Sequence, residues 1–322
     1  ARCHLPLGYS RRLPCLVSGP LAGYPRVYFI ARELIAHNDG RVDLDVLSTF
    51  VEAYQSVTPL ELGELWAIPI MLRLALIENL RRVSARVGAN RLDSDIASLW
   101  AERMIETGER DPKSMILVVA EMAQSDPPMT SAFVAELARQ LRGRSPVLSI
   151  ALTWIEQWLA EESQTIEQMV QLETRSQAAD QVSIGNSITS LRTLDGIDWR
   201  EFVERLSVVE QVLRGNPQDP YSAMDFATRD RYRHVVERLA RSSPLSEEQV
   251  ARKAMELAVD RRMRLGGADR SAHVGYFLID EGLPELEVAI DYRPSTLGRL
   301  RRIARRSPLP LYLGGIWLGS AL

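Results

Sequence analysis

The chain has 322 residues, of which 46% are hydrophobic and 25% charged, with 39 basic and 42 acidic side chains. These proportions are typical of a globular chain long enough for two domains, and they exclude a disordered tail, a collagen-like rod and a small disulfide-stapled scaffold. The only two cysteines, Cys3 and Cys15, lie near the start, so no disulfide framework holds the body together. We therefore expect a reducing compartment.

The net charge of −3 is distributed unevenly along the chain. Residues 1–30 carry +4, residues 292–322 carry +6, and residues 31–291 carry −13. A protein that binds nucleic acid concentrates basic charge on its folded face, so this distribution argues against a nucleic-acid partner. The chain begins at Ala1, without an initiator methionine or a signal peptide, and we expect it to be a piece of a longer protein.

Helical periodicity begins at residues 27–37, where apolar side chains recur at the spacing that places them on one face of a helix. They are Val27, Ile30, Ala31, Leu34 and Ile35. Nearly every later segment has the same period. The sequence therefore predicts a helical protein from its first folded element onward.

The longest helical signal follows residue 57. Thr58 can cap a helix whose first position is Pro59, and Glu61 then completes a capping box. Pro69 should kink this helix, because proline removes one backbone hydrogen bond. The side chains of this helix are apolar around nearly its whole circumference, which predicts a central core helix. They are Leu65, Ile68, Met71, Leu72, Leu74, Ala75, Leu76 and Leu80.

Caps and breakers recur at helix-length intervals along the rest of the chain. Residues 165–168 and 246–249 have capping-box spacing, and residues 198–201 begin with a capping aspartate. Only residues 182–185 could form a strand. The sequence predicts an all-α fold, an irregular array of about a dozen helices of about 10–20 residues. The breakers are Asp111-Pro112, Asp126-Pro127-Pro128, Ser145-Pro146, Asn216-Pro217, Asp219-Pro220, Gly266-Gly267, Pro284 and Pro294.

Residues 307–322 carry no charge and follow five arginines within positions 299–306. A membrane span needs about 20 apolar residues, so the segment is either the start of a span or a buried terminal helix. In the first case Tyr312 and Trp317 would lie at the membrane interface and the arginines on the cytoplasmic side. The segment alone leaves both alternatives open.

The residues themselves assign no catalytic, cofactor-binding or metal site. The four histidines have no His or Cys partner at a metal-ligand spacing, and the chain contains no GxSxG, Walker or GxGxxG motif. The histidines are His4, His37, His234 and His273. Glu61, Glu64 and Glu78 flank the apolar helix. Because Glu61 and Glu64 lie three residues apart on one helix, they cannot stand across a scissile bond as glycosidase carboxylates do.

Residues 225–234 carry six ionisable side chains other than tyrosine within ten positions. On a helix, Asp225 with Arg229 and Asp230 with His234 form i,i+4 pairs. The cluster is either a salt-bridged helix face or a docking surface for a neighbouring domain.

Residues 181–192 are rich in small hydroxyl and amide side chains. Such a string could bind a sugar or a phosphate. The same residues also cap helices and let them pack closely, so the composition alone leaves both interpretations open.

Several long strings in the chain are more specific than a short motif. They include LPLGY at 5–9, GPLAGYPRVY at 19–28, ELIAH at 33–37, FVEAYQ at 50–55, GELWAIPIMLR at 63–73, QVSIGNSITSLR at 181–192, MDFATRDRYRHVVE at 224–237 and HVGY at 273–276. These strings resemble the amino-terminal region of bacterial cyclic β-1,2-glucan synthases. The resemblance covers nearly the whole chain, although Cys3, Leu7 and Cys15 stand where polar or charged residues are expected.

The resemblance implies that this region precedes a membrane-embedded glycosyltransferase domain and a glycoside-phosphorylase-like domain. It implies that the parent enzyme uses UDP-glucose to build a β-1,2-glucan, closes it into a ring and exports it to the periplasm. The family's catalytic residues lie beyond Leu322, so none is carried over to this chain. The resemblance also favours residues 307–322 as the start of the first membrane span.

Together these inferences predict four segments: an extended basic lead-in at 1–25, helical subdomains at 26–144 and 145–306, and the membrane segment at 307–322. The expected role is a non-catalytic scaffold at the cytoplasmic face of the inner membrane that docks the catalytic domains. The alternatives are a β-1,2-glucan-binding module that uses residues 183–190 and nearby Trp199, and an independent helical adaptor.

Overall fold

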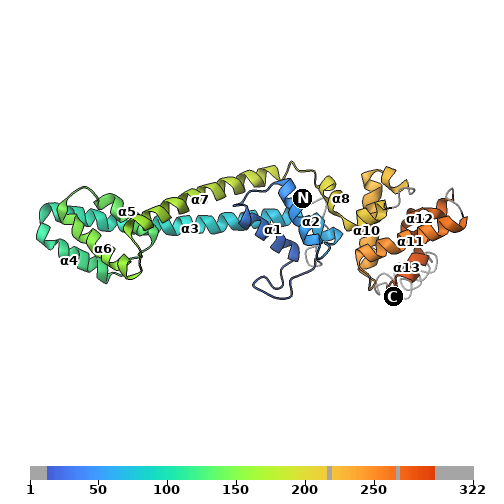
Figure 1. Cartoon of the computed structure of the whole chain (residues 1–322), viewed down its shortest axis with the longest axis horizontal. Helices are drawn as coiled ribbons and strands as arrows, with labels where there is room; N and C mark the ends of the chain where they lie inside the picture. Colours follow the sequence, from blue (N-terminus) through green and yellow to red (C-terminus); the bar gives the residue numbers. More distant parts are fainter. Residues whose placement is uncertain (1–12, 216–219, 266–268, 294–322) are drawn as a thin grey trace, which may run out of the picture. The chain divides into compact units, whose positions relative to one another are not determined.

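The computed structural model describes residues 13–215, 220–265 and 269–293 (Figure 1). Over these residues it contains thirteen α-helices and no strand, with one isolated bridge between Cys15 and Pro25, so the predicted all-α class is confirmed. The helices are α1 (Arg26–His37), α2 (Leu44–Gln55), α3 (Leu62–Arg110), α4 (Met115–Gln124), α5 (Ser131–Leu141), α6 (Ser149–Glu161), α7 (Ile166–Thr193), α8 (Trp199–Leu206), α9 (Val208–Arg214), α10 (Phe226–Ala240), α11 (Glu247–Leu265), α12 (Val274–Ile279) and α13 (Leu283–Ala289). Short 3₁₀ turns lie at Pro112–Ser114, Pro146–Leu148, Pro220–Ala223 and Arg270–Ala272.

The predicted helix starts at residues 165, 198 and 246 are confirmed. At α7 the Thr165 hydroxyl accepts the Gln168 N–H and the Gln168 side chain accepts the Thr165 N–H, which is a complete capping box. Residues 246–249 exchange the same two bonds at α11. At α8 the Asp198 carboxylate accepts the N–H groups of residues 200 and 201. These caps satisfy backbone donors that the first turn leaves without intrahelical partners.

Helix α3 begins three residues later than the predicted first position, Pro59. The Glu64 carboxylate accepts the Glu61 N–H at 2.9 Å, and the Arg26 guanidinium donates to the Pro59 carbonyl at 2.8 Å. Arg26 therefore holds the preceding residues outside the helix, and Glu64 takes the reach-back role that the sequence assigned to Glu61. The predicted start at Pro59, with Thr58 as its cap, is wrong.

Two helices are much longer than the predicted range of helix lengths: α3 has 49 residues and α7 has 28. Residues 182–185, which the sequence left as a possible strand, lie inside α7. In α3 six of the eight predicted core residues are buried, but Leu74 is 48% exposed and Leu80 is half-buried. The core-helix prediction is therefore confirmed except on the side that carries Leu74.

Contacts divide the chain into two compact units. Unit 1 comprises residues 1–27, 48–69 and 198–322, and unit 2 comprises residues 28–47 and 70–197. Each unit has its own hydrophobic core, one built on α9 to α13 and the other on the end of α3, α4 to α6 and the start of α7. The boundary expected between residues 144 and 145 lies inside unit 2, and the four predicted segments stay a prediction.

The predicted membrane segment at 307–322 lies outside the described residues. Among the helices that the structure does describe, none combines the length and the apolar composition needed to cross a bilayer.

Candidate functional site

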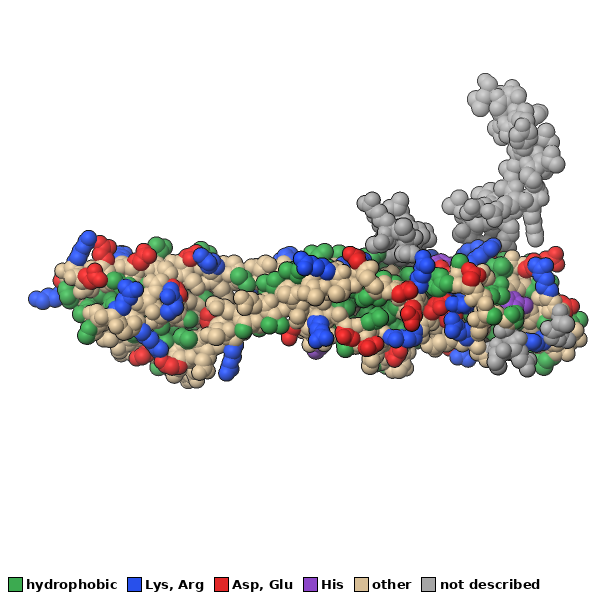
Figure 2. All heavy atoms as spheres, turned by 90° about the horizontal axis from the view of Figure 1, so that it is seen from above, with side chains coloured by type: hydrophobic (Ala, Val, Ile, Leu, Met, Phe, Trp, Pro, Cys, Tyr) green, Lys and Arg blue, Asp and Glu red, His purple; other side chains and the backbone are tan. Residues whose placement is uncertain are grey.

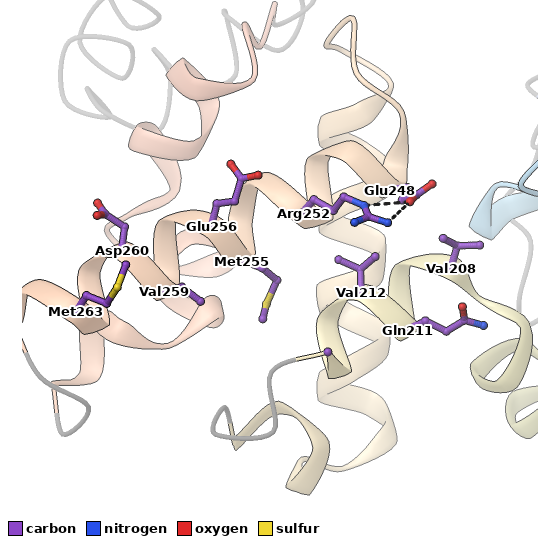
Figure 3. Close-up of a pocket in the computed structure, with 11 residues that line it drawn as sticks. Val208, Gln211, Val212, Glu248, Arg252, Met255, Glu256, Val259, Asp260 and Met263 are labelled. Atoms are coloured by element: carbon purple, nitrogen blue, oxygen red, sulfur yellow. Dashed lines mark hydrogen bonds and ion pairs between the residues drawn. The ribbon is translucent and has the colours of Figure 1, made fainter.

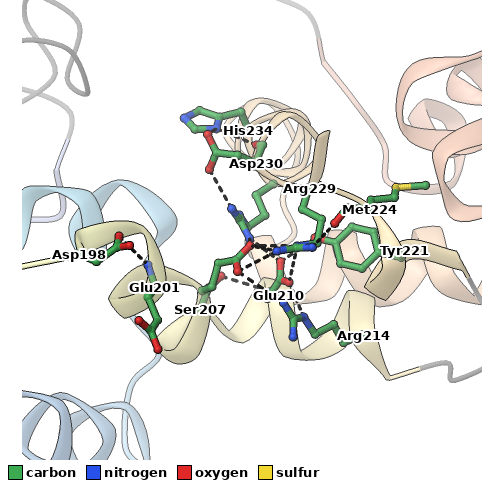
Figure 4. Close-up of polar contacts among 12 residues, drawn as sticks. Asp198, Glu201, Ser207, Glu210, Arg214, Tyr221, Met224, Arg229, Asp230 and His234 are labelled. Atoms are coloured by element: carbon green, nitrogen blue, oxygen red, sulfur yellow. Dashed lines mark hydrogen bonds and ion pairs between the residues drawn. The ribbon is translucent and has the colours of Figure 1, made fainter. Parts of the chain in front are cut away.

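A network of buried charges joins α8, α9 and α10 in unit 1 (Figure 4). Arg233 is fully buried, and its guanidinium donates to Glu210 at 2.6 Å and to Glu204 at 3.0 Å. Arg229 donates to both oxygens of Glu204, at 3.0 and 2.9 Å, and Tyr221 donates its hydroxyl to Glu210 at 2.7 Å. Each buried charge therefore has an opposite charge within hydrogen-bond distance, as burial of ions requires.

The environment shifts the pKa values of three groups in this network, Arg233, Glu204 and Tyr221. Burial opposes the charge of Arg233, but the Glu210 carboxylate beside it holds the pKa of the guanidinium above its ordinary value. Burial likewise opposes the Glu204 charge, yet hydrogen bonds from Arg233 and Arg229 hold the pKa of that carboxyl below its ordinary value. Burial and the bond to Glu210 raise the pKa of Tyr221, so its hydroxyl keeps the proton that it donates.

The structure confirms the salt-bridged interpretation of residues 225–234 for Arg229 and Arg233, whose partners lie within the same unit. The Asp230–His234 pair is confirmed at 3.3 Å. The predicted Asp225–Arg229 pair is wrong, because Asp225 precedes α10 with extended backbone dihedral angles and accepts the Thr228 hydroxyl instead. The sequence missed Glu204, Glu210 and Tyr221, since only helix packing brings them to α10.

The small polar residues of 181–192 lie inside α7, and Ser183, Ser187 and Ser190 are buried. Asn79 of α3 donates to Ser183 and Ser187, both at 3.0 Å, and Ser190 accepts the backbone N–H of residue 42 at 2.8 Å. These hydroxyls are engaged within unit 2, which favours the close-packing interpretation. Binding of β-1,2-glucan by this segment stays a prediction.

The two bonds of Asn79 belong to a polar seam, the line of polar contacts between α7 and residues 79–90 of α3. Along the seam Arg86 pairs with Asp180, and just beyond the end of α7 the exposed Asp195 pairs with Arg73, so the two helices run antiparallel. The buried polar residues of α7 are spaced seven, three, four and three residues apart, which fits the heptad repeat of a coiled-coil interface. They are Glu173, Asp180, Ser183, Ser187 and Ser190.

A second cluster of carboxylates surrounds the start of α3. Glu64 is fully buried and bound by Arg26 at 2.7 and 2.6 Å, and Glu247 of α11 accepts the Leu62 N–H at 2.8 Å. Burial raises the pKa of Glu247 to about 8, and burial together with the Glu64 charge raises that of Glu61. Residues of this cluster line a pocket of about 430 Å³ in unit 1.

Two of the three glutamates that flank the apolar helix have basic partners in the structure. Arg26 occupies both oxygens of Glu64, and Glu78 is exposed and paired with Arg81 at 2.7 Å. The sequence could not place Glu247 here, because its capping box fixes only the start of its own helix.

The histidines of the described residues make local contacts. His37 lies 3.8 Å from Glu33, His234 pairs with Asp230, and the His273 ring accepts the Gly275 N–H at 2.8 Å. His4 lies outside the described residues. No group of three or more histidine, cysteine or acidic side chains in the described part could hold a metal ion.

Figure 2 shows one face of the molecule, on which basic and acidic side chains are interspersed.

No protein-family model matches the chain. The chain is 32% identical over 308 residues to the cyclic beta-(1,2)-glucan synthase NdvB of Rhizobium meliloti (strain 1021). The match covers 95% of this chain but 11% of that protein, so the chain spans about a tenth of its relative's length. The sequence resemblance is thus confirmed, and the chain is a relative of the amino-terminal region of a cyclic β-(1,2)-glucan synthase.

Proposed function

We propose that this chain is the amino-terminal region of a cyclic β-(1,2)-glucan synthase and serves there as a non-catalytic scaffold on which the catalytic domains dock. The match to a relative about nine times longer supports the first part of the proposal. One observation carries the second part: α3 exposes a line of large apolar side chains.

The line consists of Leu74, Ile77, Leu92 and Leu99, whose exposed fractions lie between 48% and 68%. Positions 74 and 92 are five helical turns apart, position 77 is three residues after 74, and position 99 is seven after 92, so all four share one face. The residues that face α7 in the polar seam, such as Asn79, lie on the opposite side of α3. In unit 2, α3 therefore makes polar contacts with α7 on one side and exposes large apolar side chains on the opposite side.

The four side chains form two groups on this face, Leu74 with Ile77 and Leu92 with Leu99, and Arg81 lies on the face between them. Exposed apolar groups rimmed by polar residues mark interaction surfaces. Burying one leucine or isoleucine contributes about 1.5–3 kcal/mol, so four together can hold a partner. The occupant that we propose is the remainder of the same polypeptide, because the match leaves about nine tenths of the relative's length outside this chain.

In this proposal the catalytic part uses UDP-glucose as donor, and residues 307–322 start the first membrane span. The arginines at 299–306 then lie on the cytoplasmic side, which supports placing the scaffold at the cytoplasmic face. The reading frame beyond Leu322 is the first check. We expect more apolar residues and then the catalytic domains; a stop codon would instead favour an independent adaptor.

The docking experiment uses the full synthase with the double substitution Leu92→Glu and Leu99→Glu. Because both side chains are exposed, the helix should fold normally, while two buried charges would weaken docking by a few kcal/mol. We expect cyclic glucan formed from UDP-glucose to fall at least about tenfold. The matched control is Ile116→Glu with Leu117→Glu on α4, which are about 65% exposed and lie off the line. Equal activity of both double variants would contradict the proposal.

The separated chain provides a second readout. Purified alone and incubated with UDP-glucose, it should neither transfer nor hydrolyse glucose. Turnover that persists through repeated purification would overturn the scaffold assignment.

A further inference from the structure

An open apolar groove lies between α9 and α11 in unit 1 (Figure 3). Its volume is about 810 Å³, and its apolar lining comes from both helices. Val259 is 38% exposed and Met263 is 76% exposed, so part of this lining faces solvent. The apolar lining residues are Val208, Val212, Met255, Val259 and Met263.

Among the residues that line the groove, acidic side chains outnumber basic ones. Glu248, Glu256 and Asp260 line it along α11, against one basic residue, Arg252, which pairs with Glu248 at 2.6 Å. Glu256 and Asp260 also have partners outside the groove, Lys253 at 2.9 Å and Arg264 at 2.8 Å. Exposed ion pairs of this kind contribute about 0–1 kcal/mol, so incoming guanidinium groups can compete with them. A basic, amphipathic segment is therefore the complementary ligand.

This chain contains such a segment at residues 296–306, TLGRLRRIARR. Leu297, Leu300 and Ala304 recur at helical spacing, and five arginines occupy other positions. The segment itself lies outside the described residues. Its sequence combines an apolar face that matches the groove with positive charges that match the acidic side chains of the groove.

The described chain ends at the loop that precedes α11, one of the two helices that line the groove. The backbone N–H of Arg293, the last described residue, donates to the Ser242 carbonyl at 2.6 Å, in the loop that precedes α11. The groove follows α11 from Glu248 to Met263, about 22 Å at 1.5 Å per residue, and an eleven-residue helix is about 16 Å long. The segment would enter at the Glu248 end and fit within the groove.

We propose that the groove between α9 and α11 binds residues 296–306 of the same chain. The apolar side chains of the segment cover Val259 and Met263, and its arginines face Glu256 and Asp260. This binding does not depend on the proposed scaffold function. It would hold the arginines against protein rather than leave them to bind anionic lipid.

Limited trypsin digestion of the full chain tests this proposal, because trypsin cleaves after arginine and five arginines lie in the segment. Bound in the groove, the segment should be cleaved slowly. The rate of cleavage within residues 299–306 is measured by intact mass. We expect this rate to be about tenfold higher than in the unaltered chain both in Met263→Asp and in the double variant Glu256→Gln with Asp260→Asn. Because charge attraction is screened by salt, cleavage of the unaltered chain should also accelerate with ionic strength.

The matched control is Leu265→Asp, which lies on the same helix, is 59% exposed and does not line the groove. Its cleavage rate should equal that of the unaltered chain, and urea midpoints should show that all variants remain folded. Equal cleavage rates in groove and control variants would overturn the proposal. If protection from trypsin disappears when a dimer is diluted, the occupant of the groove is a second copy and the proposal is overturned. If protection requires phosphatidylglycerol vesicles, the segment binds a lipid surface, and the proposal is again overturned.

Discussion

At the scale of single residues, Glu247 links the first turn of α11 to the first turn of α3. Its carboxylate accepts the Leu62 N–H, one of the donors that a helix start leaves without an intrahelical partner. Burial of the Glu247 side chain raises its pKa to about 8 from an ordinary value of 4.5. Folding therefore makes this carboxyl bind its proton more tightly than the unfolded chain does.

This difference predicts a pH dependence of stability. A carboxyl with a raised pKa in the folded state contributes stability that is complete below about pH 4.5 and is lost as the pH rises through about 8. Glu247→Gln keeps an oxygen acceptor but cannot ionise, so its urea midpoint should decline less between pH 5 and pH 9 than that of the unaltered chain. The neighbouring Glu248→Gln is the control and should keep the original decline. Parallel curves for all three chains would contradict the argument.

Local spacing predicts three of the helix caps but fails for the cap at Thr58 and for the Asp225–Arg229 pair. The bonds at Thr165, Asp198 and Ser246 join residues two or three positions apart, and all three caps occur. The partners of Arg233 could not be predicted, because Glu204 and Glu210 lie 29 and 23 residues away in sequence. Only the packing of α8, α9 and α10 sets those distances.

At the scale of helices, the capping box at α7 gives a measurable prediction. Thr165→Ala removes the acceptor for the Gln168 N–H and should lower the free energy of unfolding by about 1 kcal/mol, measured by urea titration. Thr174→Ala is the control, since its hydroxyl bonds to the Val170 carbonyl inside the helix and caps nothing. Equal losses in the two variants would show that the cap is not the cause.

Helix periodicity predicts where helices exist better than where they end. The start of α3 depends on Arg26, which lies in another helix and holds both the Pro59 carbonyl and the Glu64 carboxylate. The length of α7 depends on the polar seam, whose serines and acidic residues gave no apolar signal in the sequence. Long-range contacts therefore override local signals at both helices.

At the scale of the whole molecule, the composition predicts a chain of two-domain length, and the contacts divide it into two units. The units are built from segments distant in sequence, so linkers and breakers do not reveal them. Each unit has a separate apolar core. Phe133 is fully buried in the core of unit 2, and Phe277 is fully buried in that of unit 1.

The core of unit 2 provides a test at this scale. Phe133→Ala should cost about 3–5 kcal/mol, because it removes a large buried side chain and leaves a cavity. Hydrogen exchange should show faster exchange of the amides of α5 and α6, which pack in that core. The exposed Leu117→Ala in the same unit should leave those amides unchanged. Unchanged exchange in Phe133→Ala would show that this core does not hold the two helices.

The polar seam also selects one alignment of α3 and α7 during folding. A seam of leucines looks much the same after one helix slips by a heptad, so several registers have similar energies. Here a slip of seven residues in either direction would separate Arg86 from Asp180 and Asn79 from both Ser183 and Ser187. A slipped pair would break these contacts, and each buried polar group that finds no new partner costs about 1–3 kcal/mol. The serines and charges of the seam therefore favour one alignment more strongly than an apolar pair of helices would.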